Sequence, residues 1–112
     1  MDLPVVRLGV PPKRRLRKTI DDETLILCAS GPGLIREEVW VDEDGKVGRY
    51  NLAFINHFMT RKDNGRVLGY DNAHGVPHRH FFGTVETVGA EEYDQIFERF
   101  LGELRVLRKE RR

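Results

Sequence analysis

Paired cysteines and long apolar runs are both missing from this sequence of 112 residues. Its single cysteine, Cys28, cannot form a disulfide within the chain, which favours a reducing, cytoplasmic location. No apolar run approaches the roughly 18 residues that cross a bilayer, so no membrane association is expected. The short N-terminal apolar runs are interrupted by Arg7, Pro11 and Pro12, unlike those of a signal peptide. We therefore expect one small domain in the cytoplasm.

The net charge is only +1, but the charges are unevenly distributed. A basic run, KRRLRK, occupies residues 13–18 of a proline-containing N-terminal segment. Such a run is typical of a solvated, loosely ordered arm, or of a patch that contacts RNA phosphates. We therefore divide the chain into a basic arm, residues 1–20, and a single α+β domain, residues 21–112. The candidate RNA-binding residues of the arm are Arg14, Arg15, Arg17 and Lys18.

Hydrophobic periodicity predicts strands followed by a helix. The apolar run TLILCAS at 24–30 indicates a buried strand, and period-two patterns indicate further strands at 34–41, 46–58, 66–72 and 78–88. Asp-Gly and Asn-Gly turns separate several of them. From Glu91 onward, apolar residues recur at helical spacing, with acids near the start and bases near the end. The prediction is an antiparallel sheet of about four to five strands, covered by a C-terminal amphipathic helix.

Functional side chains concentrate in GYDNAHGVPHRHFFG, residues 69–83. Strand alternation predicts that His78 and His80 share one face, about 7 Å apart, while Arg79 points the other way. Alternation also groups Arg66 with Leu68 and Tyr70 on one face of the preceding strand. It does not decide which of that strand's faces joins the histidines. The candidate site residues are His74, His78, His80, Arg66, Arg79, Tyr70 and Asp71, with Asn72 as an additional RNA contact.

Three interpretations of this group remain open. His74, His78, His80 and Asp71 are a possible metal-ligand set, although their spacing is not a specific signature. Alternatively, two histidines act as acid and base in RNA cleavage, in either order, while an arginine stabilises the charge that develops on the phosphate. In that reaction no metal or other cofactor is expected. The third interpretation is structural, with histidines that merely satisfy neighbouring polar groups.

A family resemblance favours the second interpretation. RYNLAFINHF, an Asn-Gly turn, RVLGYDNAHGVPHRHFFG and a helix with ERFLGELR together resemble the TumE-type toxin family, over roughly residues 46–108. The G-Y-D-N-A-H…H-R-H run is the most specific part. The resemblance implies the toxin of a type II toxin–antitoxin pair, a ribonuclease-like protein neutralised by a helix-turn-helix antitoxin. The arm matches poorly, and it is either a local addition or an antitoxin-binding segment.

Two other classes of function remain as alternatives. One is a non-catalytic module that binds RNA or protein, with salt-sensitive affinity from its basic residues. The other is a histidine-rich metal-binding protein. A homodimer is also possible through an exposed sheet edge, but the sequence does not identify the free edge.

Overall fold

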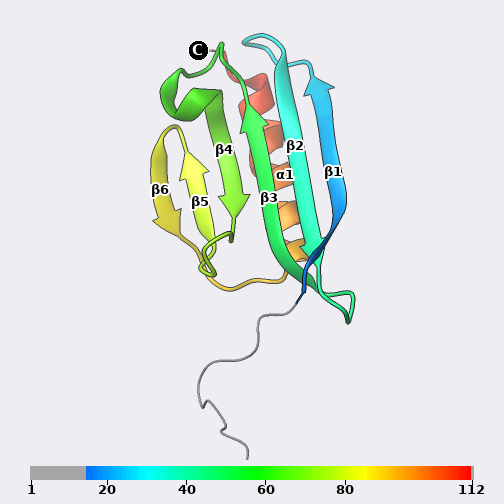
Figure 1. The fold of residues 1–112 in the computed structure, drawn as a ribbon. Helices are drawn as coiled ribbons and strands as arrows, with labels where there is room; N and C mark the ends of the chain where they lie inside the picture. Colours follow the sequence, from blue (N-terminus) through cyan, green and yellow to red (C-terminus); the bar gives the residue numbers. More distant parts are fainter. Residues whose placement is uncertain (1–14, 112) are drawn as a thin grey trace, which may run out of the picture.

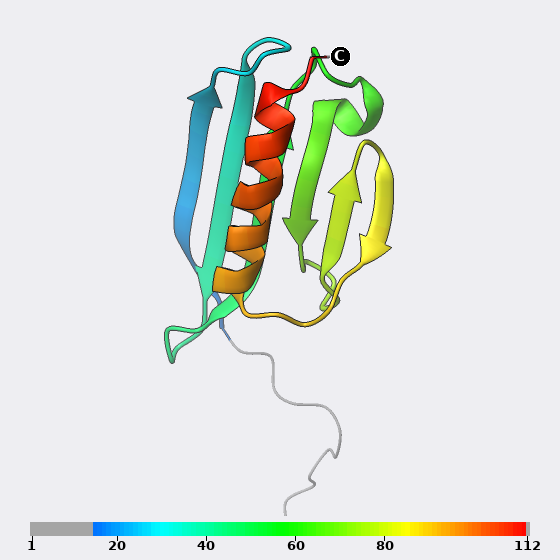
Figure 2. The ribbon, with the colours of Figure 1, turned by 180° about the vertical axis from the view of Figure 1, so that it is seen from behind.

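The computed structural model describes residues 15–111 and confirms the α+β class, with six strands instead of four to five. The strands form one antiparallel sheet in which each strand pairs with the next along the chain, and a single helix packs on one face (Figures 1 and 2). The elements are β1 (Arg17–Ile26), β2 (Gly33–Val41), β3 (Val47–Ile55), the short 3₁₀ segment η1 (Lys62–Gly65), β4 (Arg66–Asp71), β5 (His78–Phe81), β6 (Thr84–Thr87) and α1 (Tyr93–Lys109).

The additional strand arises from a turn inside the segment predicted as one strand at 78–88. Phe82 and Gly83 both adopt positive φ, +46° and +85°, and they connect β5 to β6 as a two-residue hairpin turn. Positive φ is uncommon for a bulky apolar residue. A phenylalanine at position 82 therefore gave no indication of a turn in the sequence.

The first strand differs from its prediction in both position and burial. It begins at Arg17, so residues 17–20, assigned to the arm, belong to an edge strand, whereas residues 1–14 lie outside the described range. The run at 24–30 is not buried, since Leu25 is 81% and Leu27 is 76% exposed. Charged residues of β1 pair instead with β2, as in the Lys18–Glu38 ion pair with a 2.8 Å distance between Nζ and Oε2.

The predicted turns and helix are confirmed. Asn64 and Gly65 adopt positive φ of 53° and 81°, as expected for the Asn-Gly pair, and Gly45 does so at 81° in the β2–β3 turn. The helix α1 carries Asp94 in its first turn and basic residues in its last. Its buried residues are Ile96, Phe100, Leu104 and Leu107.

One face of the sheet is therefore core and the other is open. The helix packs against β3 and β4, over a core that includes the buried side chains of Leu52, Phe54, Leu68 and Tyr70. Figure 1 views the opposite face, which α1 does not cover; we call it the open face. Within residues 15–111, no helix has the length and apolar character needed to cross a bilayer.

Candidate functional site on the open face of the sheet

The β4–β5 hairpin divides the predicted site residues between the two faces of the sheet. Asp71 pairs with His78, and Gly69 pairs with His80, whereas Tyr70 pairs with Arg79. Directly opposed residues in antiparallel strands point to the same side. His78, His80 and Asp71 therefore lie on the open face, and Tyr70 and Arg79 lie on the helix face, as the alternation of Arg79 predicted.

On the helix face, Tyr70 and Arg79 attach the hairpin to α1. The Tyr70 hydroxyl donates a hydrogen bond to Glu103, and the Arg79 guanidinium forms an ion pair with the same carboxylate. Tyr70 is fully buried, and this burial, together with the bond to Glu103, raises the pKa of its hydroxyl to about 12. Both side chains lie on the face opposite the histidines, so Tyr70 and Arg79, although predicted as site residues, are not part of a site on the open face, and Arg79 does not supply the arginine that would stabilise charge on a phosphate there.

A β-bulge brings Arg66 to the open face. Phe54 pairs with Leu68, but the next pair is Ile55 with Arg66, which leaves Val67 unpaired across the strands. Val67 is fully buried instead of pointing outward. The extra residue reverses the alternation, so the prediction that Arg66 shares a face with Leu68 and Tyr70 is wrong.

Arg66, His80 and Asp71 make a continuous hydrogen-bonded group, which we call the Arg66–His80–Asp71 cluster. The distance from Arg66 Nη2 to His80 Nδ1 is 3.0 Å, and from His80 Nε2 to Asp71 Oδ2 it is 2.7 Å. Asp63 holds the guanidinium from the other side, with Oδ2 at 2.7 Å from Arg66 Nε. A Cβ on Gly69 would lie 2.9 Å from Arg66 Cδ, so the absence of a side chain there lets Arg66 lie across the sheet toward His80.

These contacts define the tautomer of His80. A guanidinium has only donors, so His80 Nδ1 must accept from Arg66. The proton of a neutral ring is then on Nε2, where it is donated to the Asp71 carboxylate. Both ring nitrogens are thus engaged, and Nδ1 becomes a free base only when the Arg66 guanidinium moves away.

Two hollows adjoin the cluster on the open face. One is lined by Lys62, Asp63, Arg66, His80, Gly83 and Val85. The other is lined by Glu38, Trp40, Arg49, Tyr50, Asn51, Asp71, Ala73 and His74. We call the second the Trp40 hollow. Since Asp71 lines it and also binds His80, the hollow and the cluster are contiguous.

The remaining predicted residues lie apart from the cluster or act structurally. His74 is exposed in the β4–β5 loop at the wall of the Trp40 hollow. Asn72, expected to bind RNA, instead accepts a hydrogen bond from the Tyr50 backbone N–H at 2.8 Å and donates one to the Gly48 carbonyl. It therefore secures the end of β4 to β3.

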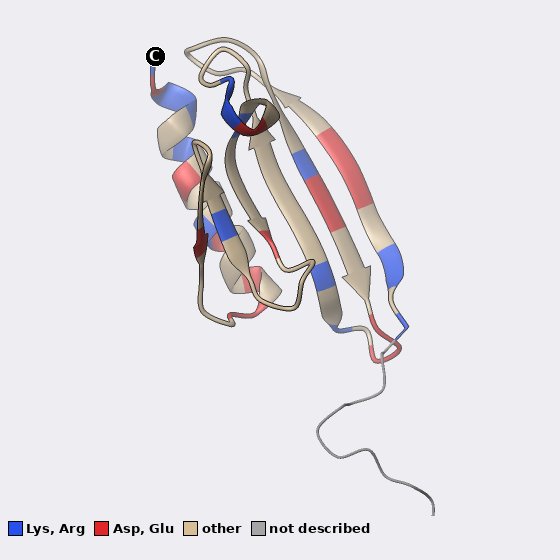
Figure 3. Cartoon of the chain, turned by 60° about the vertical axis from the view of Figure 1, so that its left-hand side comes forward, with Lys and Arg blue, Asp and Glu red and all other residues tan. Residues whose placement is uncertain are grey.

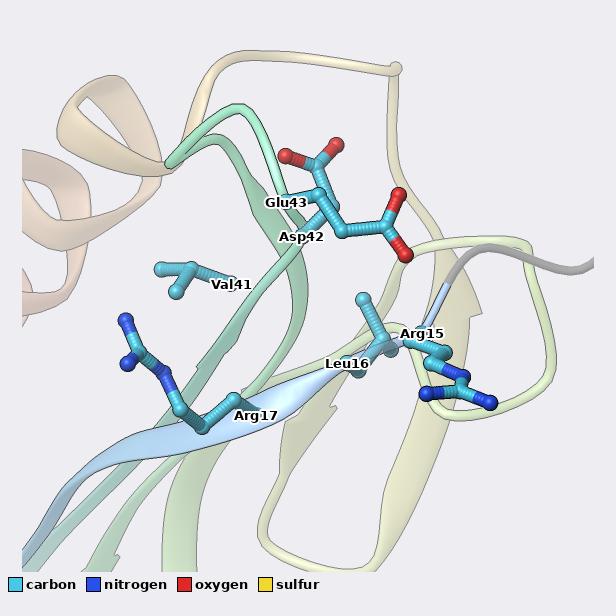
Figure 4. A pocket seen from close by; sticks show the side chains of 6 residues that line it. All are labelled: Arg15, Leu16, Arg17, Val41, Asp42 and Glu43. Atoms are coloured by element: carbon cyan, nitrogen blue, oxygen red, sulfur yellow. The ribbon is translucent and has the colours of Figure 1, made fainter.

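The basic run does not form a continuous positive face. Arg15 and Arg17 line a hollow beside the acidic turn residues Asp42 and Glu43, and their guanidinium groups point to opposite sides (Figure 4). Lys18 lies on the open face and is paired with Glu38. Arg14 lies outside the described residues. In both β1 and β2 a basic stretch is followed by an acidic one, so neither strand is positive along its length (Figure 3).

Sequence reasoning missed four residues that shape these surfaces: Glu38, Trp40, Asp63 and Glu103. A signal for the first two was available, because the Asp-Gly turn at 42–45 implies a β2–β3 hairpin. Its register places Glu38 opposite Asn51 and Trp40 opposite Arg49. The contacts of Asp63 and Glu103 depend on the bulge and on helix docking, which no local pattern shows.

Comparison with known proteins adds no relative. No protein-family model, curated protein or solved structure matches the chain. The TumE-type resemblance therefore stays a prediction. Within residues 15–111, no three His, Cys, Asp or Glu side chains lie together in a metal-ligating arrangement, so the predicted set of His74, His78, His80 and Asp71 finds no geometric support there.

Proposed function

We propose that this protein is a small endoribonuclease that cleaves RNA at the Arg66–His80–Asp71 cluster without a metal. The observation that carries the proposal is the cluster itself, a histidine fixed between a carboxylate and an arginine on an accessible sheet face. This combination supplies a proton-transfer group, its orienting partner and a binder of phosphate.

In the proposed reaction, the 2′-oxygen of RNA attacks the adjacent phosphorus and loses its proton to His80 Nδ1. The bond from phosphorus to the 5′-oxygen breaks, and that oxygen receives a proton from His78. The products are a 2′,3′-cyclic phosphate and a 5′-hydroxyl. Arg66 stabilises the charge on the phosphorane oxygens. Asp71 orients the ring and stabilises the imidazolium that forms, as carboxylates do in histidine-based catalysis.

Substrate binding should free His80 Nδ1 from its hydrogen bond with Arg66. A phosphate competes for the Arg66 guanidinium, since arginine binds phosphate oxygens with two parallel hydrogen bonds. When Arg66 turns to the phosphate, it leaves His80 Nδ1 free to accept a proton. The base thus becomes available where the scissile phosphate is bound.

The test is cleavage of labelled RNA by purified protein, with and without a chelator. We expect cleavage in both conditions, and a loss of at least about 100-fold for His80→Ala, the usual lower bound for removing a general base. His57→Ala is the matched control, because His57 is exposed and outside the cluster. Equal cleavage by the wild type and His80→Ala would refute the assignment.

A second candidate, RNA binding without cleavage, is favoured by one observation: both nitrogens of His80 are engaged. It predicts intact RNA and an affinity that falls steeply with salt. The same incubation distinguishes the two, since only the enzyme produces cyclic-phosphate ends.

The family resemblance supplies the proposed biological setting, a toxin neutralised by a helix-turn-helix antitoxin. Induced expression in a bacterial host should then arrest growth, and His80→Ala should not. Co-expression of a neighbouring helix-turn-helix gene should restore growth. Arrest by both forms would show that toxicity does not depend on the cluster.

A further inference from the structure

The Trp40 hollow, of about 350 Å³, has the size of a small-ligand site. It lies on the open face next to Asp71, on the side away from Arg66 and Lys62. Nothing in the proposed cleavage step uses its other side chains. Its aromatic wall and its acidic floor are two separate features, and each limits what can bind.

The wall is a flat, cationic stacking surface. Trp40 on β2 pairs with Arg49 on β3, and the Arg49 guanidinium carbon lies 4.6 Å from the centre of the Trp40 ring. The Lys18 ammonium lies 5.0 Å from the same ring. Nucleobases stack on aromatic rings and on guanidinium planes. This wall therefore suits a planar base attached to an anionic backbone.

The floor presents hydrogen-bond acceptors. Glu38 and Asn51 are cross-strand partners, and Asn51 Nδ2 donates to Glu38 Oε1 at 2.9 Å. Asp71 continues the row on β4, opposite Asn51. The hydrogen bond from Lys18, and then that from Asn51, hold the pKa of the Glu38 carboxyl below its ordinary value. The floor is thus anionic and selects an edge rich in N–H donors.

We propose that the Trp40 hollow is a guanine subsite, in which the base stacks on Arg49 and Trp40 and donates its N1–H and 2-amino hydrogens to Glu38. Guanine is the base that presents two such donors side by side, matching the two oxygens of one carboxylate. Glu38 Oε1 already accepts from Asn51 and Oε2 from Lys18, and each oxygen keeps a second acceptor position for the base. Adenine offers an acceptor at N1 and is repelled by the same floor.

The hollow lies beside the proposed cleavage site, so a bound guanosine would define where RNA is cut. This part of the inference rests on the proposed function. Two strand spacings, about 10 Å, separate Glu38 on β2 from the strand that carries Asp71 and Arg66. A guanosine held at Glu38 extends its 3′-phosphate across Asp71 toward His80. Cleavage on the 3′ side of guanosine follows.

The experiment uses Trp40 as its own probe, because it is the only tryptophan in the chain. Quenching of its fluorescence is measured during titration with 3′-GMP, 3′-AMP and 3′-IMP. These mononucleotides lack the phosphodiester bond that the proposed reaction cleaves. A bidentate contact to a base edge discriminates at least about fivefold. We therefore expect 3′-GMP to bind at least fivefold more tightly than 3′-AMP, and more tightly than 3′-IMP, which lacks the 2-amino group.

Two variants identify the carboxylate. Glu38→Gln should abolish the preference for 3′-GMP, while Glu23→Gln, a matched change on the same face, should keep it. Glu23 pairs with Arg36, outside the hollow. Equal quenching by all three nucleotides with the wild type overturns the subsite, as does a preference that survives in Glu38→Gln. The 3′-IMP comparison needs no variant, so it decides even if Glu38→Gln misfolds.

Failures of the two proposals are separable. RNA cleavage without preference for guanosine would support the proposed nuclease and refute the guanine subsite. A 3′-GMP preference without RNA cleavage would support the subsite and refute the proposed nuclease.

Discussion

Replacing Glu103 by leucine should destabilise the protein by about 2–3 kcal/mol. Glu103 accepts from both Tyr70 and Arg79, and it connects α1 to the β4–β5 hairpin. Loss of one partner of a buried ion pair costs about 3–5 kcal/mol, because the other charge stays buried and unpaired. Here the cost is reduced, since the Arg79 side chain is 18% exposed and retains Glu86 at 3.3 Å.

The decisive assay compares Glu103→Leu with a double variant by urea unfolding. Leucine and methionine are apolar and fill space comparable to that of glutamate and arginine, so the variant with both Arg79→Met and Glu103→Leu leaves no buried charge unpaired, and only the exposed Glu86 loses a partner. We expect it to be more stable than Glu103→Leu alone. The single change should lower Tm by roughly 10–20 °C for a domain of this size. A double variant less stable than the single one, or a single change below about 0.5 kcal/mol, would refute the reasoning.

The pKa of Glu103 also predicts how the free energy of unfolding changes at low pH. Burial alone raises the pKa of the Glu103 carboxyl, but the hydrogen bonds from Arg79 and Tyr70 outweigh it, so the pKa lies below its ordinary value. A carboxyl with a lowered folded pKa stabilises the protein above its unfolded value, about 4.3, and the stabilisation is lost as pH falls through the folded value. The difference between wild type and Glu103→Leu should therefore shrink below about pH 4.

Glycine positions yield two further predictions. Gly69→Ala should lower RNA cleavage at least about tenfold, because its Cβ meets Arg66 Cδ at 2.9 Å and misplaces the guanidinium by about an ångström; unchanged cleavage would separate the Arg66 position from activity. Gly45→Ala and Gly65→Ala both place alanine at φ +81°, which costs about 1–2 kcal/mol. Only in Gly65→Ala does the new Cβ also meet another side chain, since it would lie 2.5 Å from His57 Nδ1. Gly65→Ala should therefore be the more destabilising of the two. The difference in free energy of unfolding between the two variants should vanish in a His57→Ala background, which urea midpoints measure.

Much of the fold followed from periodicity, and the failures have specific causes. The helix and most strands were predictable because one face of each is buried at regular spacing. The strand at 24–30 was misplaced because an apolar run usually indicates burial, whereas here Leu25 lies on the open face of the edge strand β1, and Leu27, which follows that strand, is exposed as well. The β5–β6 turn escaped detection because Phe82 is not a turn residue by type.

The site was predictable in composition but not in arrangement. Alternation correctly separated Arg79 from His78 and His80. It failed at Arg66, because a bulge is a long-range property of two paired strands and leaves no local pattern. The result is that Arg66 replaces Arg79 as the cation beside His80.

Because the two faces of β5 share one backbone, the helix contact and the cluster are mechanically connected. Arg79, bound to Glu103, lies between His78 and His80 in the strand, so it fixes the strand from which both histidines project. Glu103→Leu should therefore reduce RNA cleavage at temperatures where the protein is still folded, although Glu103 lies on the opposite face from the cluster. The double variant with Arg79→Met should recover stability without recovering cleavage, since the hairpin is then no longer held to α1 by an ion pair. Circular dichroism and cleavage, measured on the same samples, test this separation, and a parallel recovery of both would show that Arg79 contributes only to stability.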